Sequence, residues 1–141
     1  MDHILAAIDG SPEAEAAVDK AADLAQALGA SLQLVYVVPP HPPPGPAAFT
    51  RGYDLGELVE HDYAPALLHQ FELRCARKGV TVDAMTAVGP VAETIADIAR
   101  TSGAGMVVVG HRERSGLSRV LLGSVADRLL QISPAPVLVV H

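Results

Sequence analysis

The stretch that decides the fold of this chain runs from Met106 to Val125 and reads MVVVGHRERSGLSRVLLGSV. Its first four residues are a continuous apolar run, rich in valine, as a strand buried on both faces requires, and Gly110 ends that run. The polar loop that follows contains three arginines and leads to a second glycine and the hydroxyl of Ser124. Backbone N–H groups near two glycines, together with arginines, are the components of an anion-binding site.

The rest of the chain alternates buried strands with amphipathic helices. His3 to Ile8 predicts a first strand, Ser11 is the expected N-cap and Pro12 the first residue of a helix, and Gly29 is the expected end of that helix. Leu32 to Val38 predicts the second strand. The same patterns predict further helices over Asp54–Lys78, after Gly89-Pro90 and over Gly123–Ile132, and further strands over Val80–Val88, Met106–Val109 and Val137–Val140.

This alternation predicts an α/β fold with a five-stranded, parallel, doubly wound (Rossmann-like) sheet and helices on both faces. A chain of 141 residues has the usual size of one domain, so we expect residues 1–141 to form a single domain. In such sheets ligands bind outside the carboxyl ends of the strands, where the winding direction reverses. Asp9, Val37 with Val38, and the loop after Gly110 are expected to meet there.

Composition excludes several classes of protein. Half of the residues are apolar and 18% are charged, which is typical of a globular chain. No apolar run reaches the ~18 residues of a membrane span, and the first residues lack the basic region of a signal peptide. Cys75 is the one cysteine, so no internal disulfide can form and a cytoplasmic location is expected. The net charge of −6 argues against nucleic acid or an anionic membrane as a partner.

Two irregular features follow the second strand. Pro39 to Pro46 contains six prolines and is expected to be a stiff, extended connector, with a ligand for a proline-recognition domain as the alternative. Pro65 predicts a kink or the start of a new helix within the helical pattern around it. Leu68, Phe71 and Cys75 share one face of that pattern, which indicates that Cys75 is a buried apolar residue rather than a reactive thiol.

These motifs together resemble the universal stress protein family. The sequence has Gly110, two residues, Glu113, nine residues and then Gly123-Ser124, where the nucleotide-binding members of that family have Gly, two residues, Gly, nine residues, Gly and Ser or Thr. The resemblance covers essentially the whole chain. It includes Ala-Ile-Asp-Gly-Ser-Pro at 7–12, the helix start with Glu93, Val-Val-Val-Gly at 107–110, Leu-Leu-Gly-Ser-Val-Ala-Asp-Arg at 121–128 and the closing Pro-Val-Leu-Val-Val at 136–140.

The resemblance implies a stress-related module that binds an adenine nucleotide, ATP with Mg²⁺, and acts by binding or signalling rather than by catalysis. It implies that Val37 and the turn after the first strand flank the adenine and ribose, with the Asp9 carboxylate accepting from ribose hydroxyls. It also implies that the loop after Gly110 lines the phosphates and that the Ser124 hydroxyl and N–H close on them. The implied binding residues are Ala7, Ile8, Asp9, Val37, Gly110, Arg112, Glu113, Gly123, Ser124 and Val125.

Glu113 departs from the family pattern, because it stands where the nucleotide binders have their second glycine. If that position requires a positive φ, glutamate costs on the order of 1 kcal/mol in strain. A carboxylate that points inward also repels phosphate. Arg112 and Arg114 can offset that charge, or Glu113 can turn to solvent and leave only its N–H in the site. The alternative function is therefore a domain that has lost ATP and acts as a dimeric interaction module, and a slow ATPase is a third.

The remaining candidates concern assembly and catalysis. Val137 to Val140 is apolar and is expected at a sheet edge, which predicts a homodimer through this strand, as the resemblance also implies. The six histidines lack metal-ligand spacing, so no metal site is expected and surface or hydrogen-bonded histidines are the main interpretation, with contact between His111 and a phosphate as the alternative. Ser115 and Ser124 lack the Gly-x-Ser-x-Gly elbow of a hydrolase, so no catalytic residue is expected.

Overall fold

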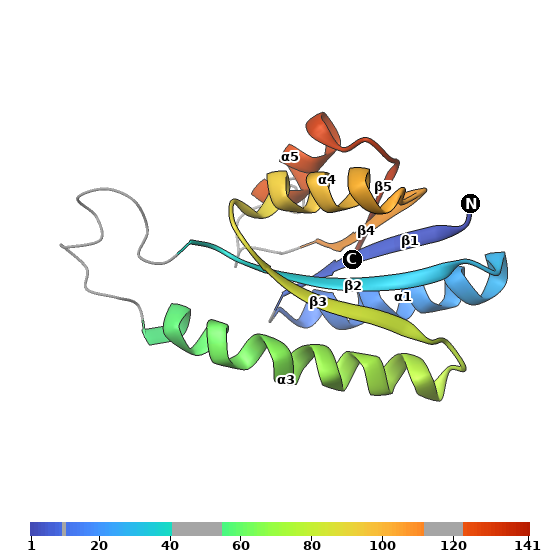
Figure 1. Ribbon diagram of the computed structural model, residues 1–141, viewed down its shortest axis with the longest axis horizontal. Coiled ribbons are helices and arrows are strands. Elements are labelled where there is room, and N and C mark those ends of the chain that lie inside the picture. The colour runs from blue at the N-terminus through green and yellow to red at the C-terminus, as the bar shows by residue number, and fades with distance from the viewer. Residues whose placement is uncertain (10, 41–54, 112–122) are drawn as a thin grey trace.

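The five predicted strands form one parallel sheet in a computed structural model that describes residues 1–9, 11–40, 55–111 and 123–141, without the side chains of 55–62 (Figure 1). The order across the sheet is β3-β2-β1-β4-β5. The predicted fold class is therefore confirmed. The strands are β1 (His3–Ile8), β2 (Ser31–Val38), β3 (Val82–Val88), β4 (Met106–Gly110) and β5 (Val137–Val140).

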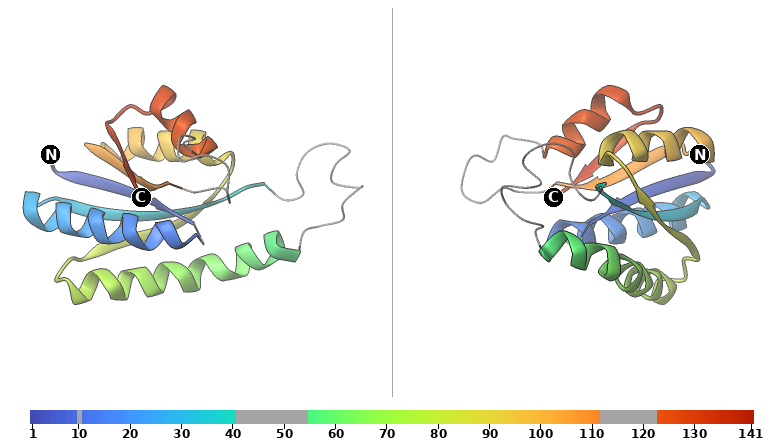
Figure 2. Two further views of the ribbon diagram at one scale, coloured as in Figure 1. Left: turned by 180° about the vertical axis from the view of Figure 1, so that it is seen from behind. Right: turned by 60° about the vertical axis from the view of Figure 1, so that its left-hand side comes forward.

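The helices cover the two faces of this sheet. Figures 1 and 2 show α1 (Pro12–Leu28) and α3 (Leu55–Arg77) on one face, and α4 (Val91–Ser102) and α5 (Ser124–Ile132) on the other. The chain moves outward from β1 to β2 and β3, and α4 then carries it back to β4 on the far side of β1. The winding direction reverses between β1 and β4, which is where a doubly wound sheet binds its ligands.

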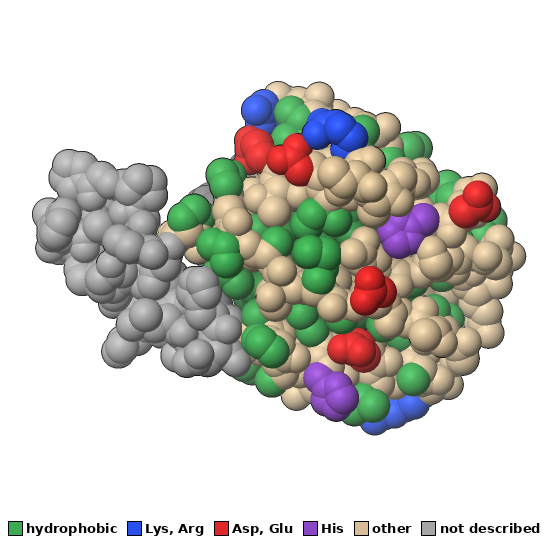
Figure 3. All heavy atoms as spheres, in the orientation of Figure 1, with side chains coloured by type: hydrophobic (Ala, Val, Ile, Leu, Met, Phe, Trp, Pro, Cys, Tyr) green, Lys and Arg blue, Asp and Glu red, His purple; other side chains and the backbone are tan. Residues whose placement is uncertain are grey.

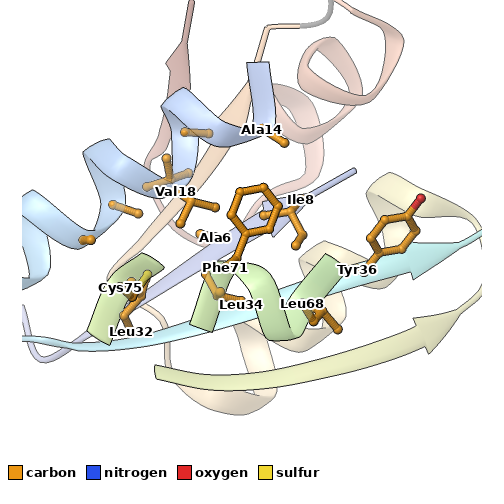
Figure 4. Close-up of a cluster of buried hydrophobic side chains, with 14 of the residues drawn as sticks. Ala6, Ile8, Ala14, Val18, Leu32, Leu34, Tyr36, Leu68, Phe71 and Cys75 are labelled. Atoms are coloured by element: carbon orange, nitrogen blue, oxygen red, sulfur yellow. The ribbon is translucent and has the colours of Figure 1, made fainter. Parts of the chain in front are cut away.

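Each face of the sheet has its own hydrophobic core, because successive residues of a strand point to opposite faces. On β2, Leu34 packs under α1 and α3, whereas Val35 packs under α4 and α5, and both are fully buried. Figure 4 shows the ring of Phe71 of α3 directed toward Ala6 and Ile8 of the sheet. Burial on both faces explains why the central strands are continuous apolar runs rather than alternating ones.

Apart from shifts of one residue at the ends of elements, the structure differs from the prediction at Pro65 and at the start of the third strand. Pro65 lies inside a single helix, α3, so it starts no new helix. The third strand begins at Val82 rather than Val80, because the N–H of Val80 donates to the Cys75 carbonyl oxygen (3.0 Å) in the turn that ends α3. Gly79 has φ of 78° in that turn, a conformation that favours glycine. Most of the predicted connector Pro39–Pro46 lies outside the described residues, since the structure describes only its first two prolines.

Within the described part of the chain, no helix is both long enough and apolar enough to cross a lipid bilayer.

Candidate functional site

A cavity of about 430 Å³ lies at the carboxyl ends of β1, β2 and β4, at the point where the winding reverses. Its volume falls within the roughly 300–1,000 Å³ of typical small-molecule sites. The described lining residues come from three strands and from the starts of three helices. They are Ala7, Ile8, Asp9, Ala14, Tyr36, Val37, Pro39, Val91, Ile95, Val109, Gly110, Gly123, Ser124, Val125 and Ala126.

Most of the predicted binding residues meet at this cavity. Arg112 and Glu113 lie outside the described residues, so the structure gives no position for them. The contact of each residue with a ligand stays a prediction, but the expected convergence of separate segments is present. The predicted residues that line the cavity are Ala7, Ile8, Asp9, Val37, Gly110, Gly123, Ser124 and Val125.

The start of α5 forms one side of the cavity. Gly123 is the N-cap of α5, and no side chain caps the first turn. The first N–H groups of a helix have no partner within the helix, and they carry the positive end of the helix dipole. Because Ser124, Val125 and Ala126 all line the cavity, this end of α5 is suited to an anionic group.

Asp9 supplies a carboxylate to the cavity wall, and Ser11 donates two hydrogen bonds to it. The Ser11 N–H donates to Asp9 Oδ1 at 2.8 Å, and the Ser11 hydroxyl donates to the same oxygen. Ser11 has the extended φ and ψ of an N-cap, as predicted, but its side chain makes no capping hydrogen bond to α1. The position predicted for the cap is therefore confirmed, whereas its hydroxyl is used by Asp9.

Gly110 brings the end of β4 close to the first turn of α1. A Cβ atom on Gly110 would lie 2.9 Å from the carbonyl oxygen of Glu13 and 3.0 Å from its carbonyl carbon. Contacts this short between a Cβ atom and backbone do not occur in real structures. Glycine at this position therefore has a packing role in addition to the predicted role beside the phosphates.

Arg128 forms an ion pair with Glu93. Its Nε donates to Glu93 Oε1 at 3.0 Å and so joins α5 to α4. This hydrogen bond lowers the pKa of the Glu93 carboxyl. Arg128 is absent from the described lining of the cavity. The three arginines of the loop after Gly110, which are Arg112, Arg114 and Arg119, lie outside the described residues.

His111 lies beside the C-terminal end of β5. Its side chain is buried, its ring centre lies 4.9 Å from that of His141, and its backbone N–H donates to the Val140 carbonyl oxygen at 2.7 Å. It is not among the described residues that line the cavity. The part of the chain that the structure describes contains no group of three His, Cys, Asp or Glu side chains able to hold a metal ion.

Sequence reasoning missed several wall residues. Tyr36 and Val109 lie near the carboxyl ends of their strands, so the strand assignments alone could have placed them at this edge. Val91 and Ile95 come from α4. No sequence motif identifies Val91 and Ile95 as wall residues, because their position at the cavity depends on which helix crosses back over β2 and β1.

A second hollow, of about 630 Å³, follows the seam between α1 and α3. Asp9 lines both hollows, whereas Ser11 lines only this second one. Arg74 lies here as well, paired with Glu15 at 2.6 Å and with Asp19 at 2.7 Å.

Comparison with known proteins agrees with this architecture. The universal stress protein family matches residues 1–141. The universal stress protein YxiE of Bacillus subtilis is 31% identical over 157 residues, which cover 100% of this chain and 99% of that protein. A universal stress protein of Mycolicibacterium smegmatis is 36% identical over 98% of this chain but only 47% of its own length, so this chain spans about half of that relative.

Solved structures give the same result. The universal stress protein UspA of Lactobacillus plantarum has a TM-score of 0.82 at 26% identity, over 99% of this chain and 97% of that chain. A universal stress protein solved in complex with cAMP has a TM-score of 0.76 at 25% identity, over 99% and 97% of the two chains. The match over the full sequence, the level of identity and the shared sheet lead to one conclusion: the chain belongs to the universal stress protein family.

Proposed function

We propose that this chain binds an adenine nucleotide, ATP together with Mg²⁺, in the cavity at the carboxyl ends of β1, β2 and β4, and acts as a stress-related binding or signalling module. The observation that carries the proposal is the meeting of Asp9, Val37, Gly110 and Ser124 around one cavity. A family member of the same fold was solved in complex with cAMP, which supports an adenine nucleotide as the class of ligand.

The chemistry of the walls suits the three parts of a nucleotide. Val37, Ile95 and Val109 offer apolar surface for a base, and the Asp9 carboxylate can accept a hydrogen bond from a ribose hydroxyl. The N–H groups at the start of α5 suit phosphate oxygens. Mg²⁺ neutralises phosphate charge when bound, and it is usually held by one or two carboxylates together with the phosphates themselves. Asp9 is the one carboxylate on the described wall and is assigned to the ribose, so the phosphates themselves would hold Mg²⁺.

We propose binding without turnover. Hydrolysis of ATP requires a residue that positions or deprotonates the attacking water. Among the described lining residues Asp9 is the sole carboxylate, and its Oδ1 already accepts two hydrogen bonds from Ser11. A phosphate-release assay with ATP and Mg²⁺ tests this point, since sustained turnover by wild type, lost in Asp9→Ala, would contradict it.

The test of nucleotide binding begins with mass spectrometry of the supernatant from denatured, purified protein. Calorimetric titration with ATP and Mg²⁺ then compares wild type with Glu113→Gly. Nucleotide in the supernatant, or binding by wild type at micromolar ATP, supports the proposal. If wild type contains no nucleotide and does not bind ATP but Glu113→Gly does, Glu113 prevents binding. The dimeric interaction module then becomes the function to test. Absence of binding by both proteins overturns a nucleotide site.

We also propose that two copies pair through β5. In a sheet, an exposed apolar edge strand favours pairing with another chain, and charged residues at an edge oppose it. β5 has four apolar residues, each only partly buried. β3, at the other edge, exposes Asp83. Figure 3 shows acidic side chains among the apolar ones on the face of the molecule that it draws. Sedimentation at micromolar concentration tests the dimer, and a monomer would contradict it.

A further inference from the structure

Ser11 is an N-cap residue whose hydroxyl does not cap its helix. A serine at this position ordinarily accepts a hydrogen bond from an N–H group of the first helical turn, and this bond stabilises the helix. In α1 that bond is absent, and the hydroxyl donates to Asp9 instead. The chain therefore gives up a stabilising local contact in order to hold a carboxylate on the cavity wall.

The contacts also determine which side of the carboxylate is held. Both donors of Ser11 reach Oδ1 of Asp9, and no described residue donates to Oδ2. Ser11 lines the second hollow between α1 and α3 and not the main cavity, whereas Asp9 borders both. Oδ1 thus already accepts two hydrogen bonds, and Oδ2 is the carboxylate oxygen left for a donor from a ligand.

We propose that Ser11 is a positioning residue that fixes Asp9 as an acceptor for a ribose hydroxyl, so that the site selects ribonucleotides over deoxyribonucleotides. The inference rests on the proposed nucleotide function. A site built to accept a hydrogen bond from a ligand hydroxyl rejects the analogue that lacks this group, because the acceptor is then desolvated without a partner. This selectivity requires an oriented carboxylate, since a freely rotating one can turn back to water.

A purely structural role for Ser11 predicts that Ser11→Ala leaves the recognition of the sugar unchanged. In that case the contact with Asp9 only shapes the turn that leads into α1. The Ser11 N–H makes the same kind of turn contact and remains in Ser11→Ala. The proposed positioning role predicts the opposite. Because the hydroxyl caps nothing, Ser11→Ala should leave the melting temperature nearly unchanged while altering the recognition of the sugar.

The experiment compares ATP, 2′-deoxy-ATP and 3′-deoxy-ATP, each with Mg²⁺, by calorimetric titration. Wild type is expected to bind ATP about tenfold or more tightly than at least one of the deoxy analogues. Ser11→Ala should weaken ATP binding by about tenfold and leave binding of that analogue within about twofold, so that the preference disappears. Ser11→Thr, which restores a hydroxyl, should restore the preference. Ser102→Ala, which removes a serine hydroxyl at the far end of α4, is the matched control.

The outcomes separate this inference from the proposed function. ATP binding by wild type with equal affinity for both deoxy analogues overturns ribose selection and leaves the nucleotide site standing. A preference that survives in Ser11→Ala overturns the role of Ser11. Binding of none of the three nucleotides overturns the proposed function and this inference with it. If Ser11→Ala has a lower melting temperature than wild type, the test compares Asp9→Ala with the double variant Asp9→Ala, Ser11→Ala. Because Ser11 acts through Asp9, adding Ser11→Ala to Asp9→Ala should not change the nucleotide selectivity any further.

Discussion

At the scale of single residues, Gly110 combines a sequence motif with a packing constraint. The resemblance to nucleotide-binding relatives places this glycine beside the phosphates. The structure adds that its missing side chain lets β4 approach the backbone of Glu13 in α1. The space around Gly110, rather than a positive φ, is therefore the reason that a larger residue does not fit.

Replacing Gly110 by alanine should destabilise the fold by about 1–3 kcal/mol, because the new methyl group forces α1 away from β4. Urea denaturation of the purified protein measures this change. Gly103→Ala is a useful control, since nothing lies within 4 Å of its Cβ position and only its φ of 69° opposes the substitution. A Gly110→Ala protein as stable as wild type would show that the two elements can separate without cost.

Cys75 is fully buried in the core under α1 and α3, as its position on the helix predicts. Burial raises the pKa of its thiol, because the thiolate is poorly solvated there. Native protein should therefore react very slowly with a thiol reagent at pH 8, and addition of urea should release one thiol per chain. Rapid labelling of the native protein would contradict this buried position.

At the scale of elements, charged side chains join α3 to α1 beside their shared core. Arg74 donates Nε and Nη2 to the two carboxylate oxygens of Asp19, both at 2.7 Å, and Nη1 lies 2.6 Å from Glu15. Lys78 continues the row with a 2.8 Å contact to Asp23. A two-point contact between arginine and carboxylate fixes the relative position of the helices more firmly than a single contact. The hydrogen bonds from Arg74 hold the pKa of Asp19 below its usual value of 3.8.

This shift predicts how stability depends on pH. Folded protein binds a proton on Asp19 more weakly than unfolded protein, so the pair stabilises the fold above pH 3.8, and this contribution is lost as pH falls through the lower folded pKa. Asp19→Asn should cost about 1 kcal/mol near neutral pH, a value kept small by partial exposure of the pair. The difference in the free energy of unfolding between wild type and Asp19→Asn should shrink below pH 3.8. Urea denaturation across pH 2.5–7 measures it, with Asp83→Asn as an exposed control, and a constant difference would contradict the assignment.

At the scale of the whole molecule, the hydrogen bonds of β5 show how a partner strand can be added. Val107 of β4 and His111, the residue after β4, donate to the carbonyl oxygens of Pro136 and Val140. Because alternate residues of a strand direct their backbone groups to opposite sides, Val137 and Val139 direct their N–H groups toward the open edge. In the proposed dimer, these N–H groups are the donors that the second copy would meet.

Val139→Pro should therefore convert the proposed dimer to a monomer while keeping the sheet. Proline removes an outward N–H and is tolerated on an edge strand. Sedimentation velocity at micromolar concentration measures the change. Leu138→Pro is the contrasting variant, because its N–H faces β4 and its loss should destabilise the fold instead. A Val139→Pro protein that remains dimeric would place the interface elsewhere.

Local features of the sequence determined most of the fold. The apolar runs of β1, β2 and β4, the glycines that end α1 and α4, and Pro12 at the start of α1 act within a few residues, so their effects can be recognised without knowing the rest of the chain. The sequence was less informative at Val80, where a helix-ending turn displaced the start of β3, and at Pro65, which α3 accommodates within one helix.

The sequence by itself determined the class of the fold, its alternation of strands and helices, and the segments that supply the cavity, because hydrophobic periodicity and turn chemistry are local properties. Only the tertiary structure decided how those segments combine. The return of α4 over the sheet brings Ile95 to the cavity, and an ion pair with Glu93 joins Arg128 to α4. Such contacts depend on the packing of distant elements and on side-chain geometry, which no local pattern encodes.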